Sequence, residues 1–162
     1  MNSKRTVYVG DVPIGGSHPV VIQSMINTDL RERSRSLDQI IRLHESGSGI
    51  VRIAYPGSQY RDDFEYIVSR APCPIIADIH FSADLAVEAM ELGASKIRIN
   101  PGNIKKRNLI KIIEKAKEFE VPIRIGVNSG SLEKELLEKY GHPVPEGLVE
   151  SALRSIEFFE QN

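Results

Sequence analysis

Short apolar runs rich in β-branched residues alternate with amphipathic stretches along most of the chain. The runs have the length of buried strands, whereas the stretches between them place apolar residues at the three- and four-residue spacing of helices. We predict strands over residues 20–25, 49–55, 74–80, 96–100 and 122–128. We predict helices over residues 36–45, 59–70, 84–91, around 109–116, 132–139 and 146–159.

Polar residues and glycines mark where several of these elements begin and end. Ser36 and Ser82 stand where a hydroxyl group can cap a helix, and Gly47 and Gly93 stand where helices end. Residues 7–16 alternate around a Gly-Asp pair, which predicts a short β-hairpin. We expect this hairpin to cover the end of the fold at which the parallel strands begin.

The repeated order of strand and helix indicates a parallel sheet covered by helices. Five such units fit two architectures. One is an open, flavodoxin-like sheet, and the other is part of a (β/α) barrel, which takes roughly 250 residues when it is closed. The chain has 162 residues, so its length alone does not decide between them.

The positions of three arginines favour the barrel. Arg52, Arg98 and Arg124 are each flanked by aliphatic residues and therefore point away from the helix-facing side of their strands. An open sheet would bury these guanidinium groups under helices at a large desolvation cost, whereas a barrel directs them into its lumen. The sequence therefore predicts an α/β fold, a partial TIM (β/α) barrel of about five units preceded by the hairpin, in a single domain over residues 1–162.

Composition narrows the classes of function. Hydrophobic residues make up 41% of the chain and charged residues 27%, which is typical of a globular domain. The net charge of -1 provides no long-range field to attract nucleic acid or an anionic membrane. No signal-peptide pattern or apolar run of membrane-spanning length is present, so we expect a cytoplasmic protein. The single cysteine, Cys73, cannot by itself hold zinc or an iron–sulfur cluster, and we predict no metal site.

Polar residues gather at the predicted strand ends. Asp78 and His80 share one side of their strand. Arg98 and Asn100 share one side of the next strand, and Arg124 and Asn128 share one side of the strand after that, while Asn103 stands in the turn that follows Asn100. Three arginines against one aspartate leave a positive site, and guanidinium groups bind phosphate oxygens in bidentate geometry. We therefore expect a dianionic or diphosphate ligand at this site.

Two alternatives remain open for these residues. The arginines could be structural, paired with Asp78, Asp29 or main-chain carbonyls inside a polar layer of the barrel. His80 could act as a general acid or base near neutral pH, or it could hydrogen-bond to groups near Asp78. Asp78 itself is better suited to orient an arginine or a ligand hydroxyl than to abstract a proton.

Several sequence strings resemble those of the hydroxymethylbutenyl diphosphate synthase family. They occur in the family's order and cover nearly the whole chain: VPIGG at 12–16, IQSM at 22–25, NTD at 27–29, ADIHF at 77–81, RINPGNI at 98–104, RIGVNSGSLE at 124–133, LEKYG at 137–141 and LVESA at 148–152. Each string is weakly specific alone, but their combination is highly specific. Ile26 and Leu30 depart from the family, which usually has threonines there.

The resemblance implies an iron–sulfur oxidoreductase of the non-mevalonate isoprenoid pathway. Such an enzyme reductively opens 2-C-methyl-D-erythritol 2,4-cyclodiphosphate to 4-hydroxy-3-methylbut-2-enyl diphosphate. It also implies that Arg52, Arg98 and Arg124 hold the phosphates and that Asn100, Asn103 and Asn128 assist, with Asp78 and His80 as the catalytic candidates in the same pocket.

The family's cofactor and partners follow from the same resemblance. A [4Fe–4S] cluster lies in a C-terminal domain that these residues do not contain, an external ferredoxin or flavodoxin supplies electrons, and the full-length form is expected to be a homodimer. We therefore expect no cofactor within this chain and no activity of the chain alone. Two further hypotheses are a barrel resembling dihydropteroate synthase and a non-catalytic assembly module that pairs through its unpaired strand edges.

Overall fold

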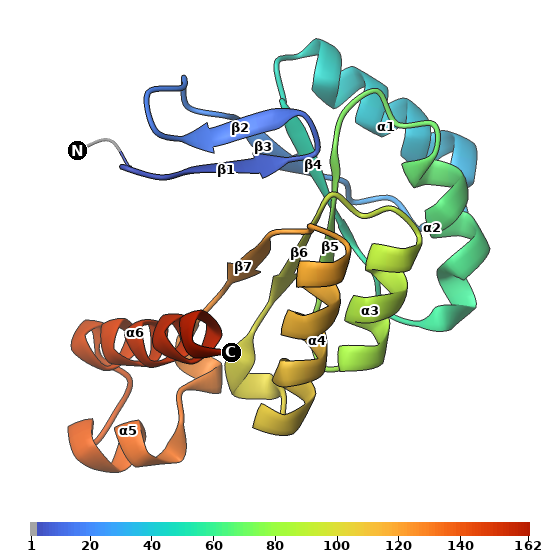
Figure 1. The fold of residues 1–162 in the computed structure, drawn as a ribbon. Helices are drawn as coiled ribbons and strands as arrows, with labels where there is room; N and C mark the ends of the chain where they lie inside the picture. Colours follow the sequence, from blue (N-terminus) through green and yellow to red (C-terminus); the bar gives the residue numbers. More distant parts are fainter. Residues whose placement is uncertain (1–2) are drawn as a thin grey trace.

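The computed structural model describes residues 3–162, and its centre is a parallel sheet in the order β3-β4-β5-β6-β7 (Figure 1). A separate antiparallel hairpin, β1-β2, precedes it. The strands are β1 (Thr6–Val9), β2 (Val12–Gly15), β3 (Gln23–Met25), β4 (Ile50–Ala54), β5 (Ile75–Ile79), β6 (Lys96–Ile99) and β7 (Ile123–Ile125). Neighbouring strands follow one another in chain order, as in a (β/α) barrel and unlike the 2-1-3-4-5 order of a flavodoxin-like sheet. Because the sheet does not close between β3 and β7, the architecture is a partial barrel, as predicted.

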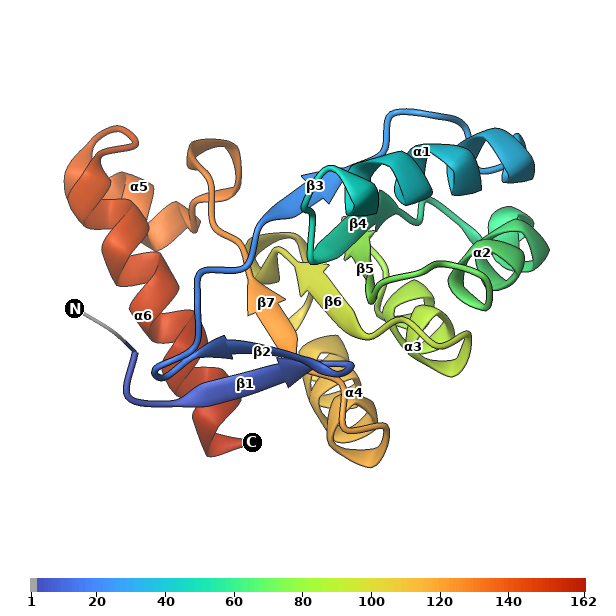
Figure 2. The same cartoon turned by 90° about the horizontal axis from the view of Figure 1, so that it is seen from above.

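Helices connect successive strands and cover one face of the sheet (Figures 1 and 2). The α-helices are α1 (Arg33–Glu45), α2 (Arg61–Val68), α3 (Ala83–Glu91), α4 (Lys106–Glu118), α5 (Lys134–Tyr140) and α6 (Pro145–Gln161). Three single turns of 3-10 helix are η1 (Ser58–Tyr60), η2 (Pro101–Asn103) and η3 (Ser129–Ser131). The strand-helix order is the one that the hydrophobic pattern predicts.

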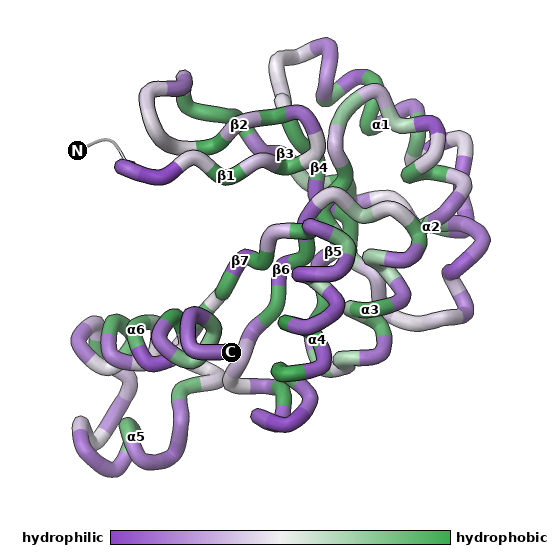
Figure 3. Tube along the Cα trace, in the orientation of Figure 1, coloured by the Kyte–Doolittle hydropathy of each residue, from purple (hydrophilic) through white to green (hydrophobic). Residues whose placement is uncertain are grey.

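The main core lies between the sheet and helices α1 to α4. The odd-numbered residues of β4 to β6, such as Val51, Ala77 and Ile97, are completely buried in this core with Ile40 and Phe64 from the helices. Figure 3 shows that the strands of the sheet are mostly hydrophobic, and the hydrophilic residues Arg52, Asp78, Lys96 and Arg98 of β4 to β6 are all even-numbered. Even-numbered residues of the same strands point to the opposite face, called the luminal face below.

The β1-β2 hairpin packs against the end of the sheet at which the strands begin (Figure 2). Val9 is completely buried against Ile50 and Ile76, which lie on the luminal face near the starts of β4 and β5. Gly10 has a φ of +59°, and a Cβ atom there would lie 3.1 Å from Pro74 Cγ. The turn of the hairpin is therefore packed closely against Pro74, the residue before β5. The hairpin is therefore an apolar plug for this end of the luminal face.

Both edge strands are shorter than the sequence pattern predicts. The predicted strand over 20–25 is β3, which begins only at Gln23, and the predicted strand over 122–128 is β7, which ends at Ile125. Each has only one hydrogen-bonded neighbour in the described sheet. The strand therefore ends where its backbone hydrogen bonds to that neighbour end, although the residues beyond also favour β-structure. Asn128 consequently lies in the loop after β7 and not on the strand.

Of the two predicted N-caps, one is confirmed and one is wrong, while Gly47 and Gly93 follow the ends of α1 and α3 as predicted. Ser82 is the N-cap of α3, and its hydroxyl accepts a hydrogen bond from the backbone N–H of Leu85. Ser36 does not cap α1, because the helix begins three residues earlier, at Arg33. Its buried hydroxyl instead donates to the carbonyl of Asp29 at 3.0 Å and ties the preceding loop to the helix.

Candidate functional site

Four cationic residues lie on the luminal face of neighbouring strands. The register pairs Asp78 of β5 with Arg98 of β6, and Arg98 with Arg124 of β7. Arg52 of β4 has the same orientation, because it alternates with the core residues Val51 and Ile53. The sheet therefore brings together the three arginines that the sequence pattern singled out, away from the face covered by α1 to α4.

Lys96 is the fourth cation, and the sequence reasoning missed it. It lies two residues before Arg98 on β6, so its side chain points to the same face, and it pairs with Ile76 in the register. The parity rule that selected the arginines would have found it. Burial, together with the positive charges of Arg124 and Arg52, lowers the pKa of Lys96 to about 8.

Asp78 holds two of the arginines in place. Its side chain is only 5% exposed, and its carboxylate oxygens lie 3.1 Å from Arg98 Nη1 and 3.6 Å from Arg52 Nε. Arg52 Nε also lies 3.2 Å from Met25 Sδ. The structural alternative for Arg52 and Arg98 therefore holds in part, since both have a protein counter-ion. Asp78 occupies the position of an orienting carboxylate.

Arg124 differs from the other two arginines because it is exposed and its side chain forms no hydrogen bond or ion pair with any residue in the range 3–162. Next to it, Gly126 lies against the guanidinium group of Arg98, and a Cβ atom at Gly126 would be 2.6 Å from Arg98 Nε. Only glycine leaves Arg98 this position. One aspartate thus faces four cations, and the face carries an excess of positive charge.

His80 lies at the edge of this group. Its side chain is exposed, and its Nε2 atom is 3.9 Å from Asp78 Oδ2, which is too long for a hydrogen bond. The ring is instead tilted against Phe81, with 5.9 Å between the ring centroids. His80 is therefore accessible to a ligand, and the alternative of a hydrogen bond to Asp78 itself is not formed.

The three candidate asparagines lie in the loops after β6 and β7. Asn100 is buried, and its amide is used inside the protein: Oδ1 accepts from the N–H of Gly102, and Nδ2 donates to Ser131 Oγ at 2.6 Å. Ser131 Oγ in turn lies 2.9 Å from Asn128 Oδ1. Asn100 and Asn128 thus join the two loops, whereas Asn103 is exposed in η2.

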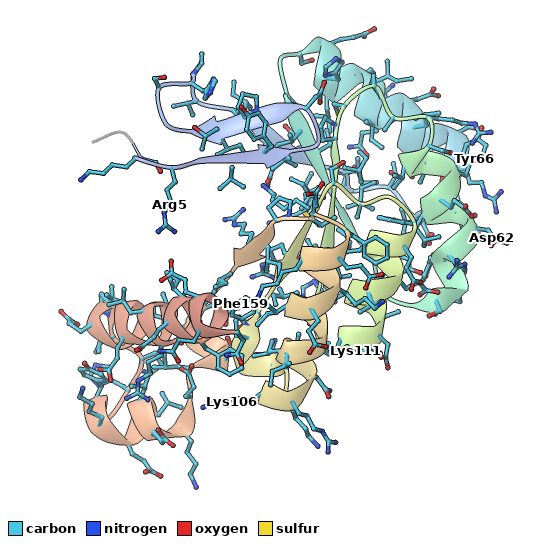
Figure 4. The ribbon with its side chains drawn as sticks, in the orientation of Figure 1. Arg5, Asp62, Tyr66, Lys106, Lys111 and Phe159 are labelled. Atoms are coloured by element: carbon cyan, nitrogen blue, oxygen red, sulfur yellow. The ribbon has the colours of Figure 1, made fainter. Side chains whose placement is uncertain are left out.

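A cavity of about 350 Å³ lies away from the luminal cations. It is formed by η2, α4, the start of α5 and α6, with Lys106 and Phe159, both labelled in Figure 4, among its lining residues. One oxygen of Glu133, which also lines this cavity, is buried and has no hydrogen-bond partner. The predicted anion site is therefore an open face of the sheet and not this cavity.

The chain does not fit a cysteine-ligated iron–sulfur cluster. Cys73 is its single cysteine and is buried in the core, where burial raises the pKa of the thiol. Across residues 3–162, no three His, Cys, Asp or Glu side chains are grouped so that they could hold a metal ion. In the same range, no helix is long and apolar enough to cross a bilayer.

The parallel strand-helix units and the hairpin at their starting end define the class of the protein, which is the (β/α) barrel. Within that class, a family model described as the GcpE TIM-barrel domain matches residues 4–162. The chain belongs to this family. The membership confirms the resemblance read from the sequence strings, and it agrees with the barrel fold predicted from the strand-helix pattern and the arginines.

Two curated relatives carry the name 4-hydroxy-3-methylbut-2-en-1-yl diphosphate synthase (flavodoxin). The protein of Natranaerobius thermophilus is 54% identical over 93% of this chain, and that of Aquifex aeolicus is 52% identical over 97%. The chain spans only 42% and 44% of their lengths. Among solved structures, Yersinia pestis dihydropteroate synthase is similar with a TM-score of 0.64 and 13% identity, covering 96% of this chain and 59% of that one. This last likeness concerns the fold alone.

Proposed function

We propose that this chain is the substrate-binding part of a 4-hydroxy-3-methylbut-2-enyl diphosphate synthase, in which the luminal face binds the cyclic diphosphate substrate. The observation that carries the proposal is the gathering of Arg52, Arg98 and Arg124 on one face of the sheet with a single carboxylate among them. This excess of positive charge favours an anionic ligand, and guanidinium groups match phosphate oxygens in bidentate geometry.

The three arginines have different roles under this proposal. Arg124 has no protein partner among residues 3–162 and is free to bind a phosphate group directly. Arg98 and Arg52 are held by Asp78 and meet the ligand with their remaining N–H groups. Asp78 acts by orienting these two guanidinium groups, and the accessible His80 is the candidate for proton transfer to or from the substrate.

The remaining parts of the reaction would come from outside these residues. The reaction is a reductive ring opening of 2-C-methyl-D-erythritol 2,4-cyclodiphosphate in isoprenoid biosynthesis, and it needs electrons that this chain cannot carry. A [4Fe–4S] cluster in a further domain would deliver them from flavodoxin, which the names of the relatives support, or from ferredoxin. We place this function in the cytoplasm and in a homodimer of the complete enzyme, with this chain as one substrate-binding domain.

Isothermal titration calorimetry with the cyclic diphosphate tests the proposal. The wild-type chain is expected to bind, and Arg98→Ala is expected to bind at least tenfold more weakly, because a charge-assisted hydrogen bond contributes about 1.5–3 kcal/mol. Arg70→Ala is the matched control, since Arg70 is exposed in the turn after α2 and stacks on Tyr66 (Tyr66 is labelled in Figure 4). Equal affinity of wild type and Arg98→Ala would contradict the role of the arginines.

A further inference from the structure

Lys96 lies below the arginines, toward the hairpin plug. Its register partner Ile76 belongs to the apolar cluster with Val9 and Ile50, while Arg98 is the next residue on the same face of β6. Lys96 is only 8% exposed. Its side chain is therefore largely enclosed between this apolar cluster and the arginines, while its Nζ atom still reaches solvent on the open luminal face.

The ammonium group of Lys96 has no counter-ion in the described structure. Asp78 and Lys96 are the two buried charged residues in the range 3–162, but Asp78 pairs with Arg98 and Arg52. No carboxylate of that range lies within 4.0 Å of the Lys96 ammonium group. The charges that act on its pKa are the positive charges of Arg124 and Arg52. Charged side chains that are largely enclosed are normally paired, so an unpaired lysine among three arginines is a position where a bound anion would be stabilised.

We propose that Lys96 is the floor of the anion site and that it takes up a proton when a diphosphate binds. The inference rests on the function proposed above and adds a residue and a coupling to it. In the empty site, the charged and titratable groups that share this face are Arg52, Asp78, His80, Arg98 and Arg124, and the three arginines disfavour a further positive charge. A bound phosphate group replaces that repulsion with attraction and favours the ammonium form.

Proton uptake is measured by titrating the cyclic diphosphate into the 162-residue chain at pH 8 in two buffers of different ionisation enthalpy. Since the pKa of Lys96 lies at about 8, close to half of the empty sites hold a neutral amine, and wild type is expected to take up about half a proton on binding. Lys96→Met is expected to bind at least tenfold more weakly and without this uptake. Lys96→Arg, which stays charged, is expected to keep most of the affinity but to lose the uptake.

Lys111→Met is the matched control, because Lys111 is an exposed lysine on the outer surface of α4 (Figure 4). It is expected to behave as wild type in both measurements. Proton uptake and affinity that are unchanged in Lys96→Met would overturn the inference and leave the proposed function intact. Urea unfolding of each variant verifies that it is folded.

A second probe separates this inference from the proposed function. Sulfate carries no proton of its own at pH 8 and offers the same tetrahedral charge as a phosphate group. If wild type binds sulfate with Lys96-dependent proton uptake but does not bind the cyclic diphosphate, the anion site with Lys96 stands and the proposed substrate is wrong. If wild type binds neither, both proposals are wrong.

Discussion

Replacing Asp78 with asparagine is expected to lower the stability of the chain and to raise its affinity for anions. Asparagine keeps the shape of the side chain but removes the negative charge that faces Arg98 at 3.1 Å and Arg52 at 3.6 Å. The two guanidinium groups and the ammonium group of Lys96 then repel one another without compensation. The same change leaves the luminal face one unit more positive toward a ligand.

The size of the stability loss follows from burial. Removing one partner of a fully buried ion pair costs about 3–5 kcal/mol. The Arg98 and Arg52 side chains are 17% and 26% exposed, so water screens part of their repulsion in the variant. The amide oxygen of asparagine also still accepts one hydrogen bond. We therefore expect a loss of about 2–3 kcal/mol in the free energy of unfolding.

Urea unfolding followed by circular dichroism, with and without sulfate, measures both effects. Sulfate is expected to stabilise Asp78→Asn more than wild type, because the anion supplies the charge that the substitution removed. Asp84→Asn is the control, since Asp84 is 83% exposed and pairs with Lys111 on the outer surface, where such a pair contributes about 0–1 kcal/mol. An Asp78→Asn chain as stable as wild type, or equally stabilised by sulfate, would refute this account of the luminal charges.

Three further predictions concern single residues. Gly126→Ala is expected to weaken sulfate binding in calorimetry at least fivefold, because its Cβ atom would displace the Arg98 guanidinium group. The stability of wild type is expected to rise with pH from about 8 to 10.5 relative to Lys96→Met, since over this window the folded chain has released the Lys96 proton and the unfolded chain has not; urea midpoints measure it. Burial raises the pKa of Glu88, but hydrogen bonds from two hydroxyl groups and from Arg61 outweigh this effect, so the pKa lies below its ordinary value. Wild type should therefore lose stability as pH falls below 4.5, and Glu88→Gln should not show this loss in acid-unfolding curves.

Opposite outcomes would identify which of these interpretations is wrong. Unchanged sulfate affinity in Gly126→Ala would mean that Arg98 does not contact the anion. A constant difference between wild type and Lys96→Met across the pH range would mean that Lys96 is not perturbed by its surroundings. Identical acid unfolding of wild type and Glu88→Gln would mean that the Glu88 hydrogen bonds are too exposed to matter.

Side-chain parity predicted the luminal face because the central strands are regular. β4, β5 and β6 are hydrogen-bonded on both sides, so every second residue keeps its direction, and the placement of Arg52, Asp78 and Arg98 follows from the sequence alone. The same rule, applied one step further back, reaches Lys96. Lys96 lies at the start of β6, whereas the active sites of barrel enzymes lie at the carboxyl ends of the strands, so the strand-end pattern does not point to it.

Residues in loops could not be predicted in the same way. The sequence pattern treats Asn100 and Asn128 as parts of their strands, but both lie beyond the last paired residue of β6 and β7. Their side chains are held by contacts with Ser131, a loop residue that strand alternation cannot predict. The role of Gly126 depends on where the Arg98 guanidinium group lies, and only the folded arrangement defines that. Fold and strand orientation are thus encoded locally, whereas the loop contacts are tertiary.

The brevity of β3 and β7 has a consequence for the behaviour of the chain in solution. A strand at the margin of a sheet presents free backbone N–H and C=O groups on which another polypeptide can add a strand. Here each margin is only three residues long, Gln23–Met25 on one side and Ile123–Ile125 on the other. So short a template gives an incoming chain few backbone hydrogen bonds, and the open sheet is thereby protected against indiscriminate aggregation.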